Sequence, residues 1–406
     1  MSQAAALSLP QRDSTGGRRT SYRSTEFGHI PKDWEIVRLG QLAKFITSGS
    51  RGWAKYYSDT GAVFVRSQNV RSGCLDFTDQ QYVTPPVSGE GTRTRICIGD
   101  ILITITGNSV GNIASVNSEI GEAYISQHVG LVRLETPSQA RFVTIFLAPG
   151  SIGNPQISGS QSGQSKPGLN LRNLEYLAIA LPPLDEQLAI AEALSDADAL
   201  IESLEQLIAK KRHIKQGAMQ ELLIGKTRLP GFSEEWETQP LEYIAPLQRG
   251  FDLPNSKLRQ GHYPVVYSNG VLNHHAVFQV KGPGVVTGRS GTIGAVTFVE
   301  QHFWPHNTSL WVTTFKGNDP KFVFYLYTRI GLERFATGSG VPTLNRNDVH
   351  AFKVKTPALK AEQTAIATIL SDMDTEIAAL ESKLAKSRQI KQGMMHNLLT
   401  GRIRLV

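Results

Sequence analysis

Polar and basic side chains gather in two short stretches of the first third of the chain, and their types suit the reading of base edges. The stretch SGSRGWAKYYSD contains Arg51, Lys55, Tyr56 and Tyr57, and the stretch FVRSQNVRSG contains Arg66, Gln68, Asn69 and Arg71. Arginine can donate two hydrogen bonds to guanine, and glutamine or asparagine can pair in the same way with adenine. Such side chains act from loops that a rigid sheet holds in place. We predict that both stretches contact DNA.

A third polar stretch, SGSQSGQSKPG, leaves two interpretations open. It carries Gln161, Gln164 and Lys166, which could contact DNA. An ordinary solvated connection between two elements would use the same residue types. Lys166 is kept as a candidate contact.

The second half of the chain carries a similar set of candidates. The stretches QRGFDLP, VVYSNG and TGRSGTIG supply Arg249, Tyr267, Ser268, Asn269, Arg289, Ser290 and Thr292. The glycines around Arg289 would let this segment approach another backbone closely, so Arg289 is the strongest single candidate. A tight hairpin would explain the same glycines, and the two interpretations are compatible. In FWPHNTSL, His306 and Asn307 are either base readers or hydrogen-bonded structural residues.

The sequence lacks the motifs that common catalytic chemistry requires. It has no Gly-x-x-x-x-Gly-Lys-Ser/Thr loop for ATP, no Asn/Asp-Pro-Pro-Tyr/Phe segment of an amino-methyltransferase, no nucleophile elbow and no His-Glu-x-x-His. His274 and His275 have no Cys, Asp or Glu cluster nearby at ligand spacing, so we predict no metal site. Cys74 and Cys97 lie in strand-like segments and are expected to be buried thiols in a reducing cytoplasm. We therefore expect a chain without catalytic activity.

Length and composition predict a globular protein of two or slightly more domains. The chain has 406 residues, which exceeds one ordinary core, and 40% are hydrophobic without a run long enough to span a bilayer. The net charge of +7 suits a protein that touches phosphate while its specificity comes from other contacts. In residues 1–25, the arginines follow a short apolar part, which is not the order of a secretory signal. We predict a flexible basic tail there, with a phosphate-binding arm as the alternative.

An internal repeat organises the chain. The segments Glu186–Leu229 and Glu362–Leu405 align without a gap at an offset of 176 residues, with 25 identities in 44 positions. Proline precedes each segment and glycine lies near its end, which are the usual start and stop signals of a helix. The sequence is therefore two tandem copies of one plan, each ending in a long helix.

Apolar residues recur at heptad spacing in both helices and predict a coiled-coil seam. The predicted seam residues are Ile190, Leu194, Ala197, Ile201, Leu204 and Ile208 in the first helix, and Ile366, Leu370, Met373, Ile377, Leu380 and Leu384 in the second. The segment between the helices is long enough to permit antiparallel pairing. The alternative is two separate helices, each docked on its own domain. The basic runs Lys210–Lys215 and Lys386–Lys391 are interpreted as solvated helix faces, with phosphate or partner contact as the alternative.

Two strand-rich domains alternate with these helices. They share a tryptophan near the start (Trp34; Trp236), a strand followed by a glycine-rich turn, and Leu-Asn before the helix (Leu169-Asn170; Leu344-Asn345). The predicted fold class is α+β, with β-rich domains at 26–183 and 230–356, helices at 184–229 and 357–406, and a pseudo-two-fold repeat. The domains have diverged strongly whereas the helices have not.

This alternation resembles the specificity subunit of Type I restriction–modification enzymes. PPLDEQLAIAEALSDAD, LLIGKTRL and LLTGRIRL are similar to the family's spacer helices, and GDILITITGNSVG and KGPGVVTGRSGTIGAVTF to turns of its target-recognition domains. The resemblance implies that each domain reads one half of a split, asymmetric DNA target and that the helices fix the distance between the halves. It also implies two methyltransferase subunits and restriction–motor subunits as partners, which would carry S-adenosylmethionine, ATP and Mg²⁺.

Two other functions stay open from the sequence. A coiled-coil scaffold could pair other proteins without binding DNA, and it would show no salt-dependent binding to duplex. An undetected enzyme, such as a self-contained methyltransferase, would bind S-adenosylmethionine on the isolated chain.

Overall fold

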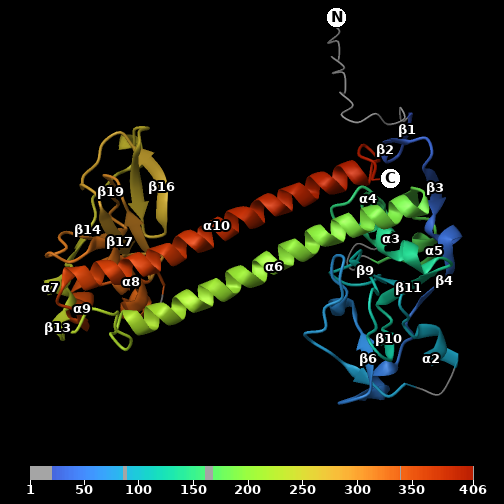
Figure 1. Cartoon of the computed structure of the whole chain (residues 1–406), viewed down its shortest axis with the longest axis horizontal. Helices are drawn as coiled ribbons and strands as arrows, with labels where there is room; N and C mark the ends of the chain where they lie inside the picture. The colour runs from blue at the N-terminus through green and yellow to red at the C-terminus, as the bar shows by residue number, and fades with distance from the viewer. Residues whose placement is uncertain (1–20, 86–88, 161–167, 339, 406) are drawn as a thin grey trace, which may run out of the picture. The chain divides into compact units, whose positions relative to one another are not determined.

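The computed structural model describes residues 21–85, 89–160, 168–338 and 340–405 of the chain. It divides into two compact units, residues 1–202 with 385–406 and residues 203–384. We call them unit 1 and unit 2 and describe each by itself (Figure 1). Within the described ranges, no helix combines the length and the apolar character that a membrane crossing requires.

Unit 1 is built on a four-stranded antiparallel sheet that is buried on both faces. Its order is β4-β11-β8-β9, with bounds Ala43–Ser48, Val129–Leu134, Asp100–Thr104 and Ile113–Ser115. Successive side chains of a strand point to opposite faces. Ile101 and Ile103 of β8 accordingly pack in one core cluster, and Leu102 packs in another. Helix α3 (Ala140–Leu147) supplies Phe142 and Phe146 to the first cluster.

A second sheet of unit 1 shares the other cluster. Its order is β10-β6-β7-β5, with bounds Ala123–Ile125, Ala62–Val65, Tyr82–Val83 and Tyr57–Ser58, and β10 lies parallel to β6. Val65 and Ile125 pack with Leu102 between the two sheets. Unit 1 also contains the ribbons β1-β2 (Tyr22–Thr25, Gly28–Pro31) and β3-β12 (Glu35–Arg38, Ala178–Leu181). Its shorter helices include α1 (Leu39–Leu42), α2 (Gly89–Thr94), α4 (Pro155–Gly159) and α5 (Leu171–Glu175).

Unit 2 repeats this plan. Its main sheet has the order β14-β20-β17-β18, with bounds Leu247–Arg249, Ser309–Val312, Gly284–Gly288 and Val296–Val299. Its second sheet has the order β16-β15-β19 (Gly270–His275, Tyr263–Tyr267, Trp304–Pro305), with β15 parallel to β19. The ribbons are β13-β23 (Trp236–Pro240, Lys353–Pro357) and β21-β22 (Ala336–Thr337, Thr343–Leu344), and the helices are α7 (Leu241–Ile244), α8 (Pro320–Ile330) and α9 (Arg346–Ala351). The predicted duplication of an α+β plan is confirmed.

Two long helices, α6 (Leu184–Leu222) and α10 (Lys360–Leu398), have 39 residues each and pack together in antiparallel fashion. In unit 1, Lys391 of α10 pairs with Asp198 of α6. In unit 2 the repeat-related pair Lys215–Asp374 forms again, beside Lys211 Nζ–Glu376 Oε1 at 2.6 Å. Lys211, Lys215 and Lys391 therefore pair with acidic residues of the other helix, while most residues of the two basic runs are exposed, as their interpretation as solvated helix faces predicts.

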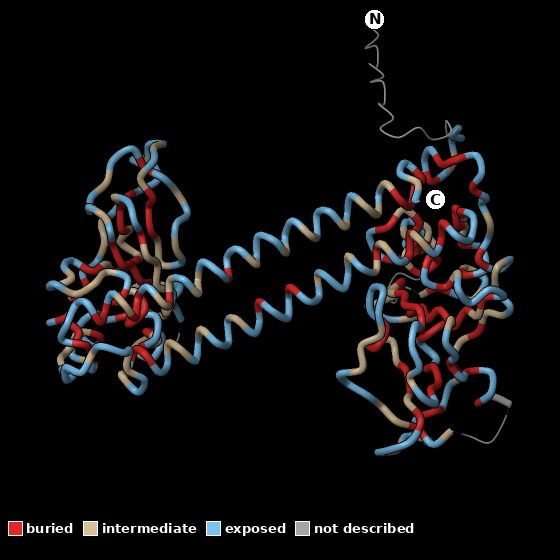
Figure 2. The backbone as a smooth tube through the Cα atoms, viewed as in Figure 1, coloured by how far each residue is buried: buried red, intermediate tan, exposed pale blue. Residues whose placement is uncertain are grey.

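The predicted seam is present, but residues of its first heptad pack in the domain cores. Leu204, Ile208 and Ile377 are buried, while Ile201, Leu380 and Leu384 are half-buried. Leu194 instead packs in the core of unit 1, and Leu370 packs in the core of unit 2. Figure 2 accordingly shows buried positions concentrated in the two domains and sparse along the helices. The helix pairing is thus confirmed, and each helix also docks on the domain that precedes it.

In each unit, a buried glutamate at the start of one long helix accepts hydrogen bonds from a tryptophan of the domain and from an arginine that follows the other long helix. In unit 1, Glu186 at the start of α6 accepts hydrogen bonds from Trp34 Nε1 (3.1 Å) and from Arg404 Nη2 (2.7 Å), which follows α10. Burial lowers the pKa of Arg404, but its hydrogen bonds to Asp33 and Glu186 outweigh burial and raise that pKa. We call this cluster of Trp34, Glu186 and Arg404 the latch of unit 1.

The latch of unit 2 consists of the repeat-related residues Trp236, Glu362 and Arg228. Arg228 Nε and Nη2 donate to the two oxygens of Glu362 at 2.7 and 3.0 Å, and Trp236 Nε1 donates at 3.3 Å. The Glu362 side chain is 1% exposed. The same three residue types therefore fix the ends of the long helices in both units.

Two expectations about unit 1 are corrected. Residues 22–25, assigned to the basic tail, form β1 and pair with β2, and Arg23 Nη2 donates to Trp34 O at 2.6 Å. The other tail arginines lie outside the described residues. Cys74 and Cys97 are free thiols but exposed, because both fall in loops and not in strands.

Candidate nucleic-acid interface

Four loops of unit 2 meet at one end of its two sheets and bring most of its predicted residues together. They follow β14, β15 and β17 and precede β20. Backbone hydrogen bonds hold them: Gly250 N donates to Ser309 O (3.0 Å), and His306 N donates to Val266 O (2.8 Å). A Cβ atom at Gly250 would lie 2.2 Å from His306 O, so only glycine permits this approach. We call these loops the strand-end loops of unit 2.

Arg289 lies at the centre of this set. Its backbone N donates to Thr308 O at 2.9 Å, and its carbonyl accepts from Leu344 N at 2.8 Å. The side chain is half-buried, and among the described residues no hydrogen bond or ion pair engages its guanidinium group. Ser290 is half-buried and Thr292 exposed in the same turn. The turn joins the antiparallel pair β17 and β18, so it is a hairpin connection that also presents an unengaged arginine.

The other predicted residues of unit 2 surround this turn. The ring of Tyr267 lies 4.3 Å from that of His306, and Asn269 is exposed beside it. Burial lowers the pKa of His306, which favours the neutral ring at neutral pH. Arg249 Nη2 lies 3.7 Å from Asp252 Oδ1, and Asn307 Nδ2 donates to the same oxygen. The loop that carries His306 and Asn307 is joined to the Arg289 turn through the hydrogen bond from Arg289 N to Thr308 O.

In unit 1 the stretch after β6 forms the corresponding set. Arg66 Nη2 lies 3.1 Å from Asp79 Oδ1, and Gln68 Nε2 donates to Asp79 Oδ2. Arg71 is 55% exposed and lies 3.3 Å from Asp76. The structure thus brings Arg66 and Gln68 together, with a carboxylate between them.

Asn69 has a different role from the predicted one. It is 2% exposed, and its Oδ1 accepts from Arg66 N at 2.9 Å. Its Nδ2 donates to the carbonyls of Asp76 and Asp79, both at 2.9 Å. Because this amide is satisfied inside the protein, Asn69 is corrected from a base reader to a residue that ties two loops together.

The segment after β4, up to the start of β5, carries the exposed residues Arg51, Lys55 and Tyr57. Trp53 of the short helix η1 (Trp53–Tyr56) is 3% exposed and stacks on Phe64, which anchors the loop. Sequence reasoning missed Arg93 of α2, whose guanidinium donates to Ser48 O (3.0 Å) and Ser50 Oγ (2.9 Å). Lys166, Gln161 and Gln164 lie outside the described residues.

The backbone hydrogen bonds show which residues of the two units correspond. Ser126 N donates to Val65 O, Ile105 N to His128 O and Leu169 N to Ile105 O, at 2.8, 2.9 and 2.9 Å, as the equivalent groups do in unit 2. The pattern equates Arg66 with Tyr267, Gln68 with Asn269, Ile105 with Arg289, and Gln127 with Asn307. The frame is shared and the side chains on it differ. Exposed Gln127 and His128 were missed, although aligning AYISQHVGL with FWPHNTSL would have found them.

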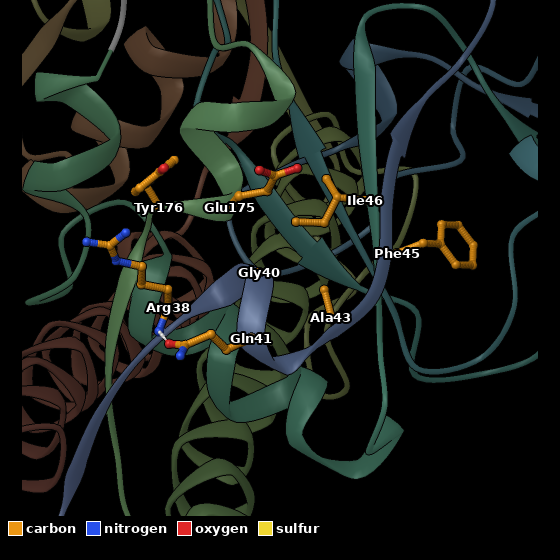
Figure 3. Close-up of a pocket in the computed structure, with 8 residues that line it drawn as sticks. All are labelled: Arg38, Gly40, Gln41, Ala43, Phe45, Ile46, Glu175 and Tyr176. Carbon is orange, nitrogen blue, oxygen red and sulfur yellow. Dashed lines mark hydrogen bonds between the residues drawn. The ribbon is translucent and has the colours of Figure 1, made fainter.

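A shallow pocket of unit 1 lies outside this set. It has a volume of about 330 Å³ and lies between α1, β4 and α5 (Figure 3). The guanidinium of Arg38 lies 4.5 Å from the ring centre of Tyr176 at its rim. None of the predicted base readers lines it.

Of the adjacent histidines His274 and His275, the second has a packing role. His275 is 4% exposed, accepts from Arg259 N at 3.0 Å and packs edge-on against Trp304. Among the residues that the structure describes, no group of three or more His, Cys, Asp or Glu could hold a metal ion.

Comparison with known proteins identifies the family. The model of the Type I restriction modification DNA specificity domain matches residues 31–210 and 233–391, which is most of the chain and both repeats. The chain belongs to this family. Sequence-specific recognition of DNA within a restriction–modification system is the role of the family, and its members are the non-catalytic subunits.

Individual relatives span nearly the whole chain. A putative type I restriction enzyme MjaX specificity subunit of Methanocaldococcus jannaschii is 25% identical over 96% of this chain and 98% of its own length. The MjaVIII specificity subunit of the same organism is 22% identical over 93% and 94%. The crystal structure of the S subunit of M. genitalium has a TM-score of 0.64 at 15% identity and covers 90% of this chain and 96% of that one. A chain from a structural study of type I complex assembly has a TM-score of 0.54 at 16% identity, over 92% and 99%. These structures share the fold.

Proposed function

We propose that this chain reads a split, asymmetric DNA target. One half is read by the strand-end loops of unit 2, and the other by the strand-end loops of unit 1, which follow β4, β6 and β8 and precede β11. The observation that carries the proposal is the duplicated frame with unlike side chains on it. Arg66 and Gln68 of unit 1 occupy the backbone positions that Tyr267 and Asn269 occupy in unit 2. Side chains with different donors and acceptors select different base pairs in the major groove. Two unlike half-sites, and not a palindrome, follow from this.

The proposed role includes partners. Methyltransferase subunits would dock on this chain and carry S-adenosylmethionine, and restriction–motor subunits would carry ATP and Mg²⁺. This chain would direct them to the target without taking part in bond making or breaking. The family membership of the chain supports this division of labour.

Single-molecule methylome sequencing of cells that carry the system tests the proposal. We expect one methylated motif with two unlike half-sites and an unspecified spacer. Binding of the full chain to duplex should also weaken steeply as salt rises, because phosphate contacts release counterions. A palindromic motif, or binding that does not depend on salt, would contradict the proposal.

Arg289 gives the sharpest single-residue prediction. Replacing it by alanine should relax discrimination at one base pair by about 1–3 kcal/mol, because a guanidinium that donates twice to a base is lost. Competition binding with duplexes that vary one base pair at a time measures this. Lys321→Ala is the matched control, because Lys321 pairs with Glu300 after β18, at the other end of the sheet, at 3.6 Å. Unchanged discrimination in Arg289→Ala would remove Arg289 from the interface.

A further inference from the structure

Aspartates sit between the candidate readers of both units. In unit 1, one carboxylate engages two predicted readers: Asp79 Oδ1 lies 3.1 Å from Arg66 Nη2, and its Oδ2 accepts from Gln68 Nε2. In unit 2, Asp252 Oδ1 accepts from Asn307 Nδ2 and lies 3.7 Å from Arg249 Nη2. Asp79 and Asp252 were not among the predicted site residues.

The segment that carries Asp79 is itself fixed. The backbone carbonyl oxygen of Asp79 accepts hydrogen bonds from Arg66 Nη2 at 3.2 Å and from Asn69 Nδ2 at 2.9 Å. Asp76, at the start of this segment, accepts from Thr78 N and Thr78 Oγ1 at 3.0 and 2.7 Å. The buried amide of Asn69 therefore anchors a short loop that holds the carboxylate at the tips of Arg66 and Gln68.

Stability alone does not account for these aspartates. The side chain of Asp79 is 69% exposed and that of Asp252 is 73% exposed. Ion pairs at such positions contribute little to folding, because water and salt screen them. A carboxylate also repels the phosphates of a duplex, so an aspartate among basic readers weakens binding that depends on phosphate alone.

We propose that Asp79 and Asp252 are positioning residues that fix two base readers each before DNA arrives. The proposal rests on the proposed function. A free arginine or glutamine loses rotamer freedom when it is ordered on a base, and ordering it beforehand removes that cost from binding. The carboxylate thus strengthens binding to the correct half-site and weakens binding to other sequences, and both effects increase discrimination.

The test uses the full chain and two sets of duplexes. One set carries the motif from methylome sequencing with one base pair replaced at a time, and the other is a scrambled duplex of equal length and composition. Asp79→Ala should weaken binding to the correct motif by about 5–30-fold, as expected when two side chains are no longer ordered. Binding to the scrambled duplex should stay equal or rise. Asp79→Asn keeps one acceptor and should give a smaller loss of the same kind.

The position of the effect separates this proposal from a simple change of charge. Asp79→Ala should relax discrimination in one half-site, and Asp252→Ala in the other. Arg66→Ala should add little at the same base pair once Asp79 is gone, because coupled residues are not additive. Glu119→Ala is the control, since exposed Glu119 lies between the end of β9 and the start of β10, away from the strand-end loops.

Three results would overturn the proposal. Equal changes at every base pair, as in Glu119→Ala, would show a net-charge effect only. Unchanged discrimination in Asp79→Ala and Asp79→Asn would show that the readers need no positioning. A wild-type chain that binds correct and scrambled duplexes equally would overturn the proposed function as well, and the two failures are thereby distinguished.

Discussion

Replacing Arg404 by alanine should lower the free energy of unfolding of unit 1 by about 3–5 kcal/mol, the cost of leaving a buried charge without its partner. The carboxylate of Glu186 has 0% exposure and would keep Trp34 Nε1 as its one remaining donor among the contacts described above. Arg404 also donates to Asp33 and thereby lowers the pKa of that carboxyl, so a second favourable contact is lost. Urea unfolding of the purified chain, followed by tryptophan fluorescence, measures the change.

Arg402 provides the matched control, because it is an exposed arginine in the same segment after α10. Arg402→Ala should change stability by less than about 0.5 kcal/mol, as is usual for a surface position. The double variant Glu186→Leu with Arg404→Met should recover part of the loss, since a packed apolar pair can replace a buried ion pair while Trp34 Nε1 loses its acceptor. If Arg404→Ala and Arg402→Ala were equally mild, the latch would not contribute to stability.

The latch also shows where sequence reasoning reached its limit. The repeat placed Glu186 and the arginine of the TRL and IRL endings at matching positions in both copies, and a tryptophan near the start of each domain was a shared landmark. Their meeting depends on a helix that returns to the first domain across a separation of 218 residues between Glu186 and Arg404. No local propensity or period encodes such a contact. The helices themselves were predictable because a repeat of 44 positions and a heptad pattern are strong, local signals.

The candidate site was predictable by residue type and not by orientation. Arg289 and Asn269 were predicted as readers, and they lie at the strand ends with side chains free to face a ligand. Asn69 has the same chemistry, yet its amide is satisfied by two carbonyls of the loop that carries Asp79. Whether a polar side chain forms its hydrogen bonds inside the protein depends on a loop elsewhere in the chain. The heptad positions nearest the domains also depend on distant parts of the chain, because Leu194 packs in the core of unit 1 and Leu370 in the core of unit 2.

A longer helix pair should change the distance between the half-sites and leave the half-sites themselves unaltered. The pairs Lys391–Asp198 and Lys215–Asp374 follow one antiparallel register, which sets residues 195–201 of α6 opposite residues 388–394 of α10. Duplicating both heptads keeps the seam in phase and lengthens each helix by about 10 Å at roughly 1.5 Å per residue. At about 3.4 Å per base pair, the spacer should grow by about three base pairs.

The natural target should then be lost. Three base pairs turn the duplex by about 100° at roughly 10.5 base pairs per turn, so one domain no longer faces its half-site on the original spacing. Losing the contacts of a whole half-site should weaken binding by more than about 100-fold, since each mismatched base pair alone costs about 1–3 kcal/mol. Methylome sequencing of cells that carry the variant shows the spacer length and the half-sites of the methylated motif. Competition binding to the natural target measures the loss of affinity. Duplicating the heptad in α6 alone is the control, because it breaks the register and should abolish modification. A methylated motif with the original spacer, or with altered half-sites, would show that the helices do not set the distance.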